Sequence, residues 1–411
     1  MNLQSSKTIQ TTAGIFLKLF IPCIVSLWSC EEKSKSPSSF NLQVIKVEPN
    51  KTDDSFSNLI NEQKLIRLEA PDSILIREIN RIKLSSKHIF ISDNAAIFVY
   101  DTTGRLVSLI KNLGKGPGQY KTISDFSIDT LKNQVEIMDN QHRTFMTYDF
   151  NGHLVSERSI PLVAIAYARS NDLIYFYSGN EINLQSSYSL NETDSEKYEI
   201  SSKYFPISPD DARYLHIRFP YHFYTYKNSV RFFKPLNDTI FSLSNKTIAS
   251  QYAIDFGKNR IDPEELFSMP HQNIMDFFNV LRSKEYAFNV ANILENENYL
   301  FFTYHFQTET FHVAFDKSSQ QVFQTKKIKY AFLNRHTQPA TTVNFGKAIR
   351  RNTVYSVMES YEFVTIMDSL KKTFSAGEWA SFETTNQQAA NLYGKIRIDD
   401  NPILIVSHIK Q

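Results

Sequence analysis

Short apolar stretches alternate with polar turns along most of this chain, and one eight-residue pattern occurs twice. Segments 100–107 and 148–155 both read Tyr-Asp, two further residues, Gly, one residue and Leu-Val, at an offset of 48 residues. In each copy we expect one strand to end at Tyr-Asp and the next to begin at Leu-Val. Gly104 and Gly152 are expected to close the turn, where glycine adopts a positive φ at little cost. The pattern predicts a repeated β-hairpin.

A second apolar run precedes each copy, over 88–92 and 135–138. Two hairpins per unit, at a period of 40 to 50 residues, are typical of a β-propeller blade with about four short strands. Later units are more degenerate because turns rely on Asn, Asp and Ser rather than on glycine, of which the chain has 11. Their strands are expected over 173–177, 187–190, 229–233, 239–243, 249–256, 299–304, 311–316 and 321–327.

Other segments have helical periodicity. Residues 262–265 combine an N-cap aspartate, a first-turn proline and two glutamates, and apolar side chains at helical spacing follow within 274–281. The same spacing recurs within 363–370, and a further helix is expected over 377–392. We interpret these segments as helical insertions in the late blades that pack against the propeller.

Residues 1–29 have the composition of a lipoprotein signal peptide. Lys7 and Lys18 accompany an apolar stretch over 19–28, and Leu27-Trp28-Ser29-Cys30 resembles a lipobox, after which Cys30 would carry the lipid. A spanning helix is the weaker interpretation, because the apolar core is about ten residues long and a bilayer needs about 20. The other alternative is that Cys30 is an ordinary small residue at the end of a buried segment.

Residues 30–40 are polar and predict a flexible tether, followed by one folded domain over 41–411. Glu31 and Glu32, directly after the lipidation site, resemble the surface-export signal of Bacteroidetes lipoproteins; a solvated linker is the alternative. We therefore expect a cell-envelope location as an outer-membrane lipoprotein, on the cell surface or the periplasmic face.

Charge and cysteine content exclude several classes of protein. Loss of the leader lowers the number of lysines and arginines from 45 to 43, against 43 acidic residues, so the mature chain is formally neutral. Nucleic-acid binding, which needs clustered cations, is not expected. The only cysteines are Cys23, within the leader, and Cys30, which leaves neither a disulfide nor a multi-cysteine zinc site.

Three motifs carry a family resemblance. The loop Gly114-Lys115-Gly116-Pro117-Gly118-Gln119-Tyr120 resembles the Gly-x-Gly-Pro-Gly-Glu-Tyr loop of the six-bladed β-propeller lipoproteins of Bacteroidetes, relatives of the NHL-repeat propellers, with Gln119 in place of glutamate. Segments 236–241 and 400–404 are similar to the family's Asn-Asp-Thr-Ile-Tyr and Asp-Asn-Pro-x-Leu motifs. The resemblance implies a propeller fold and supplies no catalytic residues.

We therefore predict an all-β fold, a six-bladed β-propeller with a few helical insertions in the late blades. A strand at about 42–47 and the final strand at 403–409 are expected to help close the ring, which leaves few unpaired strand edges.

Candidate ligand-binding residues come from the glycine-rich loop and from one turn. A phosphate cradle is disfavoured because no helix follows the loop and the Walker spacing is absent, so its glycines are expected to shape a crossover between blades. If the loop lies at the channel mouth, Lys115, Gln119 and Tyr120 could contact a ligand. His142 and Arg143 belong to scattered residues that a propeller could bring to its central channel.

No catalytic residue, cofactor or metal site is predicted, because no hydrolase or zinc-protease motif is present and the histidines are scattered. The Asp-Asn pairs at 93–94 and 139–140 are interpreted as turn residues, with calcium binding as a minor alternative. We expect a monomeric, lipid-anchored binding or scaffolding protein with a glycan, peptide or envelope-protein partner. The alternative is a lyase, lactonase or hydrolase with a metal-assisted site in the channel.

Overall fold

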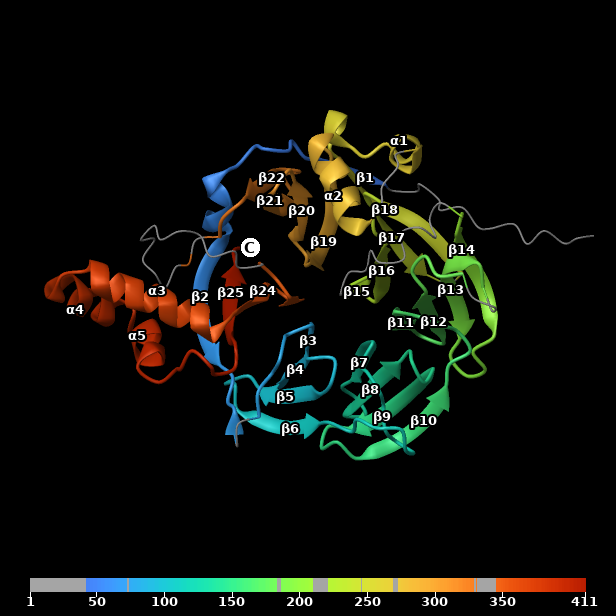
Figure 1. The fold of residues 1–411 in the computed structure, drawn as a ribbon, viewed down its shortest axis with the longest axis horizontal. Coiled ribbons are helices and arrows are strands. Elements are labelled where there is room, and N and C mark those ends of the chain that lie inside the picture. The colour runs from blue at the N-terminus through green and yellow to red at the C-terminus, as the bar shows by residue number, and fades with distance from the viewer. Residues whose placement is uncertain are drawn as a thin grey trace, which may run out of the picture. The chain divides into compact units, whose positions relative to one another are not determined.

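The structure is a computed structural model that describes residues 42–71, 74–182, 186–209, 221–244, 246–268, 273–328, 330 and 345–411. Within residues 42–411 six small sheets stand side by side in a ring, each running from an inner strand near the axis to an outer strand (Figure 1). Among the named strands of the described residues, all pairings are antiparallel except one. The prediction of a six-bladed β-propeller is confirmed.

The blades are numbered here in chain order, with strands given from the axis outward. Blade 1 contains β3 (Arg81–Leu84), β4 (His88–Ser92), β5 (Ile97–Asp101) and β6 (Leu106–Ile110). Blade 2 contains β7 (Asp125–Asp129), β8 (Gln134–Asp139), β9 (Thr144–Asp149) and β10 (Leu154–Ser159). Blade 3 contains β11 (Ala166–Ser170), β12 (Leu173–Tyr177), β13 (Tyr188–Asp194) and β14 (Ile200–Pro206).

The remaining blades include strands from the N-terminal segment. Blade 4 contains β15 (Phe223–Tyr226), β16 (Ser229–Phe233), β17 (Thr239–Ser244), β18 (Thr247–Asp255) and, outermost, β1 (Gln43–Lys46). Blade 5 contains β19 (Ala287–Glu295), β20 (Tyr299–Phe306), β21 (Glu309–Asp316) and β22 (Val322–Thr325). Blade 6 contains β23 (Ala348–Arg350), β24 (Thr353–Met358), β25 (Ile403–Ile409) and, outermost, β2 (Ile60–Arg67).

The repeated Tyr-Asp hairpin has the same structure in both copies. The carboxylates of Asp101 and Asp149 accept backbone N–H groups two and four residues on, and Gly104 and Gly152 have φ angles of 92° and 90°. At Gly104 a Cβ would lie 2.1 Å from the carbonyl oxygen of Arg67 in blade 6. The glycine is therefore required both by its backbone conformation and by the close approach of the neighbouring blade.

The ring is closed by strands from opposite ends of the chain. β2 pairs antiparallel with β25, from Ile60 opposite Ile409 to Arg67 opposite Ile403. The final strand, predicted at 403–409, is confirmed. The prediction that 42–47 provides the N-terminal closing strand is wrong, because β2 fills that position.

The predicted strand at 42–47 does exist, as β1, but it extends blade 4. It pairs with β18 in parallel, and Ile45 is fully buried in the apolar cluster that joins blades 4 and 5. The chain then passes blade 5, where the Gln324 side-chain amide donates to the carbonyl oxygen of Glu48 at 2.7 Å. Residues 43–67 thus form a strap along blades 4, 5 and 6. The sequence does not predict the path of this strap, because the pattern of apolar and polar residues indicates where strands occur and not which strands they pair with.

Helices occur where insertions were expected. α1 (Pro263–Ser268) and α2 (Ile274–Ser283) lie between blades 4 and 5, and the Asp262 carboxylate accepts the Glu264 N–H at 2.9 Å as an N-cap. α3 (Ser360–Thr373), α4 (Ala376–Thr385) and α5 (Gln387–Tyr393) lie between β24 and β25. The helix expected over 377–392 is divided in two, because Asn386 leaves the helical conformation.

The insertion α3–α5 covers the outer edge of blade 6, beside β2 in Figure 1. Its apolar side chains pack on Leu65 of β2 and on Ile403 and Ile405 of β25. The Gln388 amide accepts the Leu65 N–H at 3.1 Å and donates to the Leu65 carbonyl at 2.9 Å. One side chain therefore satisfies both backbone groups of an edge residue, which protects that edge from further strand pairing.

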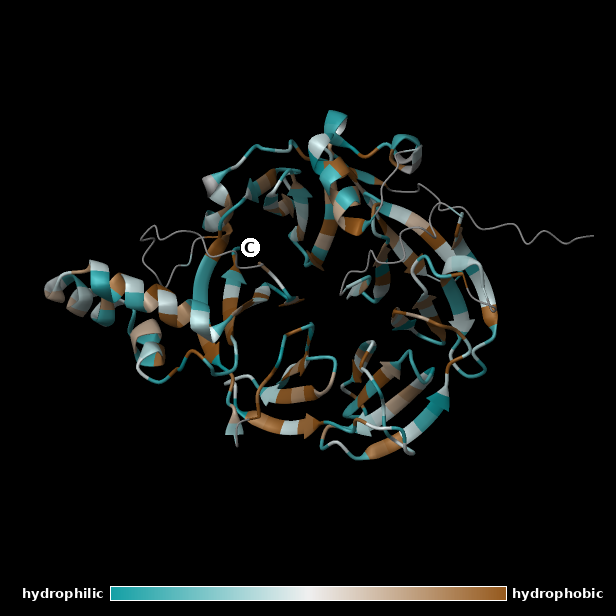
Figure 2. Ribbon diagram, viewed as in Figure 1, coloured by the Kyte–Doolittle hydropathy of each residue, from teal (hydrophilic) through white to brown (hydrophobic). Residues whose placement is uncertain are grey.

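The core lies between blades and not at a single centre. Most buried clusters join facing sheets: for example, Ile82 and Tyr100 of blade 1 pack with Ala348 and Leu404 of blade 6. Two others join helices to one blade, α3–α5 to blade 6 and α1–α2 to blade 5. Figure 2 shows hydrophobic and hydrophilic residues alternating along many of the strands, as expected where successive side chains point to opposite faces of a sheet. Among the described helices, none is long and apolar enough to cross a membrane.

Candidate functional site

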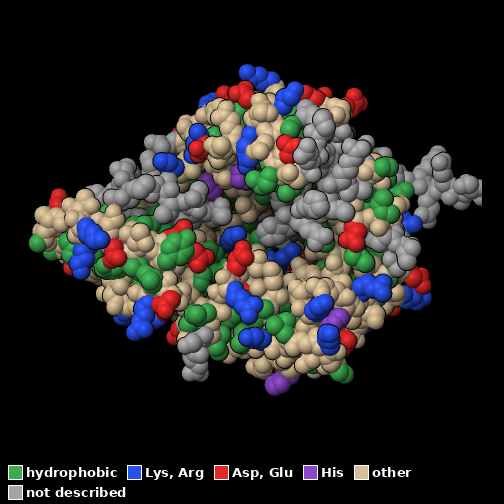
Figure 3. Space-filling model, in the orientation of Figure 1, with side chains coloured by type: hydrophobic (Ala, Val, Ile, Leu, Met, Phe, Trp, Pro, Cys, Tyr) green, Lys and Arg blue, Asp and Glu red, His purple; other side chains and the backbone are tan. Residues whose placement is uncertain are grey.

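The inner strands of all six blades line a cavity of about 660 Å³ on the ring axis. Each inner strand pairs on one side only, so its other edge turns backbone N–H and C=O groups toward the axis. One such group, the N–H of Ile82, donates to the Tyr221 hydroxyl at 3.1 Å. In Figure 3 side chains of both charges gather around the centre of the face shown. The cavity is in the size range of small-molecule sites.

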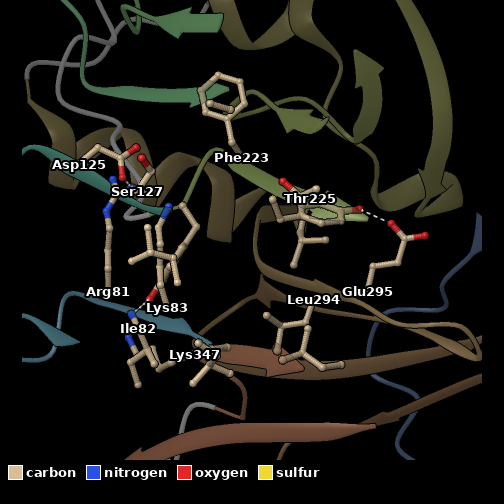
Figure 4. A pocket seen from close by; sticks show the side chains of 18 of the residues that line it. Arg81, Ile82, Lys83, Asp125, Ser127, Phe223, Thr225, Leu294, Glu295 and Lys347 are labelled. Atoms are coloured by element: carbon tan, nitrogen blue, oxygen red, sulfur yellow. Dashed lines mark hydrogen bonds and ion pairs between the residues drawn. The ribbon is translucent and has the colours of Figure 1, made fainter. Parts of the chain in front are cut away.

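A first ion pair joins the inner strands of blades 1 and 2. Arg81 on β3 lies 2.5 Å from Asp125 on β7, and both side chains are largely buried (Figure 4). Asp125 also accepts the N–H of Tyr167, on the inner strand of blade 3, at 3.1 Å. One carboxylate thus connects three blades, and its oxygen lone pairs are directed at protein donors.

A second ion pair lies between blades 2 and 3. The Arg169 guanidinium on β11 donates to both oxygens of Glu136, each at 2.7 Å, in a bidentate arrangement. Burial opposes the charge of Arg169, but the hydrogen bonds and the charge of Glu136 outweigh this effect and raise the arginine pKa. The Tyr167 hydroxyl donates at 2.9 Å to Ser127, another residue of the cavity wall.

A buried carboxylate network supports the wall at blades 4 and 5. Glu295, at the end of β19, accepts the Lys317 ammonium at 2.7 Å and the hydroxyls of Tyr224 and Tyr252 at 2.9 and 2.8 Å. Arg231 lies 3.6 Å from the same carboxylate. Burial and the Glu295 charge raise the pKa of Tyr224 well above its usual value, so this hydroxyl stays protonated. The network fixes the position of β15 against β19.

Two lysines of the wall lack such partners. Lys83, on β3, and Lys347, directly before β23, have no carboxylate within 4 Å among the described residues. Burial lowers the pKa of Lys83, with the Asp125 charge opposing the shift and the Arg81 charge adding to it. Burial also lowers the pKa of Lys347, against the charges of Glu78 and Glu359.

Local backbone geometry positions both lysines. The strand period of two places Arg81 and Lys83 on the side of β3 that faces blade 2, where the Lys83 ammonium lies 5.3 Å from the Phe126 ring centre. Gly346 precedes Lys347 with a φ of 81°, and a Cβ there would lie 2.4 Å from a methyl carbon of Leu294. A glycine is therefore needed for the chain to turn into β23 beside blade 5.

Residues 42–408 match the family described as a domain of unknown function, DUF4934. This chain belongs to the DUF4934 family. No curated protein shows significant similarity to it.

Solved structures resemble the DUF4934 chain in fold. A Bacteroides fragilis protein classed as exported has 17% identity and a TM-score of 0.69, over 90% of this chain and 100% of its own. A member of the DUF4221 family from Bacteroides vulgatus has 10% identity and a TM-score of 0.50, over 85% and 97% of the two chains. At these identities the likeness extends to the fold alone.

The five ligand-binding residues predicted from the sequence do not line the cavity of this DUF4934 protein. The glycine-rich loop connects the outer strand of blade 1 to the inner strand of blade 2, so it is a crossover between blades, as interpreted. Lys115 is exposed, Gln119 accepts the Gly116 N–H at 2.9 Å, and the Tyr120 hydroxyl lies fully buried, 3.0 Å from the Ala95 carbonyl oxygen.

His142 and Arg143 lie in the turn between β8 and β9. The His142 ring is 3.0 Å from the Asp139 carboxylate, and Arg143 has a φ of 54°. Asp139 accepts the N–H groups of Gln141 and His142, and Asp93 accepts those of Ala95 and Ala96. Both Asp-Asn pairs are therefore turn residues. The proposed lipidation site, Cys30, lies outside the described residues.

Sequence reasoning missed the charged residues of the cavity wall. The pattern Arg81-Ile82-Lys83 could have indicated two of these residues, because its charges occupy alternate positions on a short strand that begins a repeat unit. Among residues that the structure describes, no group of three or more histidine, cysteine, aspartate or glutamate side chains could hold a metal ion. The arrangement offers hydrogen-bond donors, positive charge and aromatic surface to a small molecule.

Proposed function

We propose that this DUF4934 protein is a lipid-anchored cell-envelope protein that binds a small ligand in its central cavity without converting it. The observation that carries the proposal is the cavity itself, whose wall is drawn from all six inner strands and combines charged, hydroxyl and aromatic side chains. Binding sites are generally concave and mainly apolar, with a few convergent polar groups. Rigid blades hold those groups in place before the ligand arrives, which reduces the entropic cost of binding.

The cellular location rests on separate observations. The leader over 1–29, the lipobox at Cys30 and the polar tether over 30–40 support export and lipid anchoring. Likeness in fold to a Bacteroides fragilis protein classed as exported agrees with a place outside the cytoplasm. Together they describe a binding domain held at the envelope by its N-terminus.

A single substitution in the cavity tests the proposed function. Thr225 on β15 lines the cavity, is exposed to it and makes no side-chain hydrogen bond in the described part of the chain (Figure 4). Thr225→Trp adds an indole to the cavity. Ser156→Trp, on the exposed outer strand β10, is the matched control because it places the same ring on the outside of blade 2.

The measurement is the change in melting temperature of the mature protein with a panel of neutral sugars, acidic sugars, dipeptides and organic acids. A ligand at 100 times its Kd stabilises by about 2.7 kcal/mol, which for a domain of this size is a shift of about 3 °C. We expect at least one compound to shift the wild type and Ser156→Trp but not Thr225→Trp. A panel without effect, or a shift retained in Thr225→Trp, would contradict the proposal, and turnover of a bound compound would show an enzyme instead.

A further inference from the structure

The cavity wall has more positive charge than its own acidic groups neutralise. Among the described residues, four cationic side chains line it: two arginines, Arg81 and Arg169, and two lysines, Lys83 and Lys347. Each arginine is held by a carboxylate at 2.5 to 2.7 Å and has no free charge to offer. Of these four cations, the two lysines are still available to bind a ligand.

The acidic groups that the structure describes in the wall are all engaged elsewhere. Asp125 is held by Arg81 and by two backbone N–H groups, and Glu295 is held by Lys317 and Arg231. Asp129 lies at the end of β7, where it is half-exposed and 3.8 Å from Lys132. Among the described acidic groups of the wall, none can pair with either lysine without the loss of an existing contact. Outside the wall, the charges of Glu78 and Glu359 act on Lys347, but neither carboxylate lies within 4 Å of it.

An ammonium group without a counter-charge in such a wall is costly, because burial removes its hydration. The lowered pKa values of Lys83 and Lys347 are the expected response to that cost. A bound oxyanion would supply the missing charge and would accept hydrogen bonds from the ammonium groups. The protonated lysines would then be stable.

The surroundings of the lysines favour an organic anion over a bare ion. About 660 Å³ is far more room than an inorganic oxyanion fills. Ser127 and Thr225 offer hydroxyl groups, and the Phe223 ring offers flat apolar surface in the same cavity (Figure 4). The Tyr221 ring, which also lines the cavity, lies 5.7 Å from the Arg81 guanidinium beside β3. Aromatic rings of this kind pack against the carbon skeleton of a ligand.

We propose that the ligand of this cavity is a small organic oxyanion, a carboxylate or a phosphate ester, whose charged group binds Lys83 and Lys347. The proposal rests on the proposed function, since it names the chemical class of the molecule that the cavity takes. It also assigns different roles to the four cations of the wall: the two arginines stabilise the ring, and the two lysines bind the ligand.

The test uses single Lys83→Met and Lys347→Met variants, which keep the length of the side chain and remove its charge. Lys326→Met is the matched control, because the Lys326 ammonium lies 5.2 Å from the Phe311 ring centre, as Lys83 lies 5.3 Å from Phe126, yet Lys326 is not part of the cavity wall. The probes are glucuronate, glucose 6-phosphate and neutral glucose, titrated calorimetrically into the mature protein at low ionic strength.

We expect the wild type and Lys326→Met to bind one of the two anionic probes at least tenfold more tightly than glucose, and each cavity variant to lose at least tenfold in that affinity. Preference for glucuronate would identify the carboxylate, and preference for glucose 6-phosphate the phosphate ester. As a second readout, the anionic probe should slow acetylation of Lys83 and Lys347 by acetic anhydride at least tenfold and leave Lys326 unchanged.

Equal affinity for glucose and for both anions, or anion binding unaffected by both lysine variants, would overturn the inference. If a neutral compound still binds and Thr225→Trp abolishes its binding, the cavity is a ligand site without anion preference and only the inference fails. If no compound, charged or neutral, responds to Thr225→Trp, the proposed function fails as well.

Discussion

Loss of one partner from the buried ion pair between Arg81 and Asp125 is expected to destabilise the ring strongly. At 2.5 Å and an effective dielectric constant of about 20, the Coulomb energy of the pair is about 7 kcal/mol. Desolvation of two buried charges offsets much of this gain, so the pair adds little net stability, but removal of one partner leaves an unpaired buried charge. Asp125→Asn should therefore cost about 3 to 5 kcal/mol in the free energy of unfolding.

The asparagine oxygen can still accept the N–H of Tyr167, but the amide NH2 takes the place of the oxygen that accepts the N–H of Phe126, so the loss combines the charge with one backbone hydrogen bond. Arg81→Met then removes the cation that Asp125→Asn leaves unpaired. We expect the double variant to be more stable than Asp125→Asn alone, with a coupling energy of at least about 1.5 kcal/mol. The assay is urea unfolding followed by tryptophan fluorescence and circular dichroism, because urea does not screen charge as guanidinium does. Additive effects of the two substitutions would refute the reasoning.

Three further outcomes follow from other parts of the ring. Burial, and to a smaller extent the charge of the nearby His305, lower the pKa of His312 to about 4, so the unfolded chain binds more protons than the folded chain between pH 4 and 6.5. The free energy of unfolding should therefore fall by about 2 kcal/mol from pH 7 to 5. His312→Gln should remove that difference in urea titrations at the two pH values. Gly104→Ala should cost about 2 kcal/mol or more, because its φ is 92° and its Cβ would collide with the Arg67 carbonyl; an unchanged melting temperature would contradict this. Gln388→Ala should cost about 1 to 3 kcal/mol and speed amide exchange at Leu65, whereas unchanged exchange would show that α5 does not protect this edge.

The sequence predicted the fold well where local chemistry repeats. The Tyr-Asp-x-x-Gly-x-Leu-Val pattern encodes one hairpin completely, since its aspartate, glycine and apolar positions each satisfy a local requirement of the turn. The structure adds that Tyr100 and Tyr148 donate to the crossover-loop carbonyls of Glu69 and Gly118. Each repeat thus carries its contact to the preceding loop as well.

Long-range pairing could not be predicted in the same way. Residues 60–67 read Ile-Asn-Glu-Gln-Lys-Leu-Ile-Arg and lack the alternation of a strand, so nothing local marks them, and not 42–47, as the strand that pairs with β25. The strap along blades 4 to 6 depends on side-chain contacts such as that of Gln324 with Glu48, separated by 276 residues. Such contacts leave no periodic signal.

The candidate site was missed for a related reason. Glycine-rich loops and histidines are common in binding and catalytic sites, but here the loop residues Gln119 and Tyr120 form hydrogen bonds with nearby backbone groups. The cavity is formed by one short strand from each blade, and Lys83 and Lys347 are far apart in the chain. Only ring closure brings them to the same wall.

Anomalous diffraction from crystals grown with selenate tests the central claim most directly, because selenate is a compact oxyanion whose selenium can be located independently of the protein. We expect a selenium peak inside the cavity with an oxygen in hydrogen-bond contact with Lys83 or Lys347, and loss of that peak in the Lys83→Met/Lys347→Met double variant. Peaks confined to the outer surface, or a cavity peak that persists in the double variant, would contradict it.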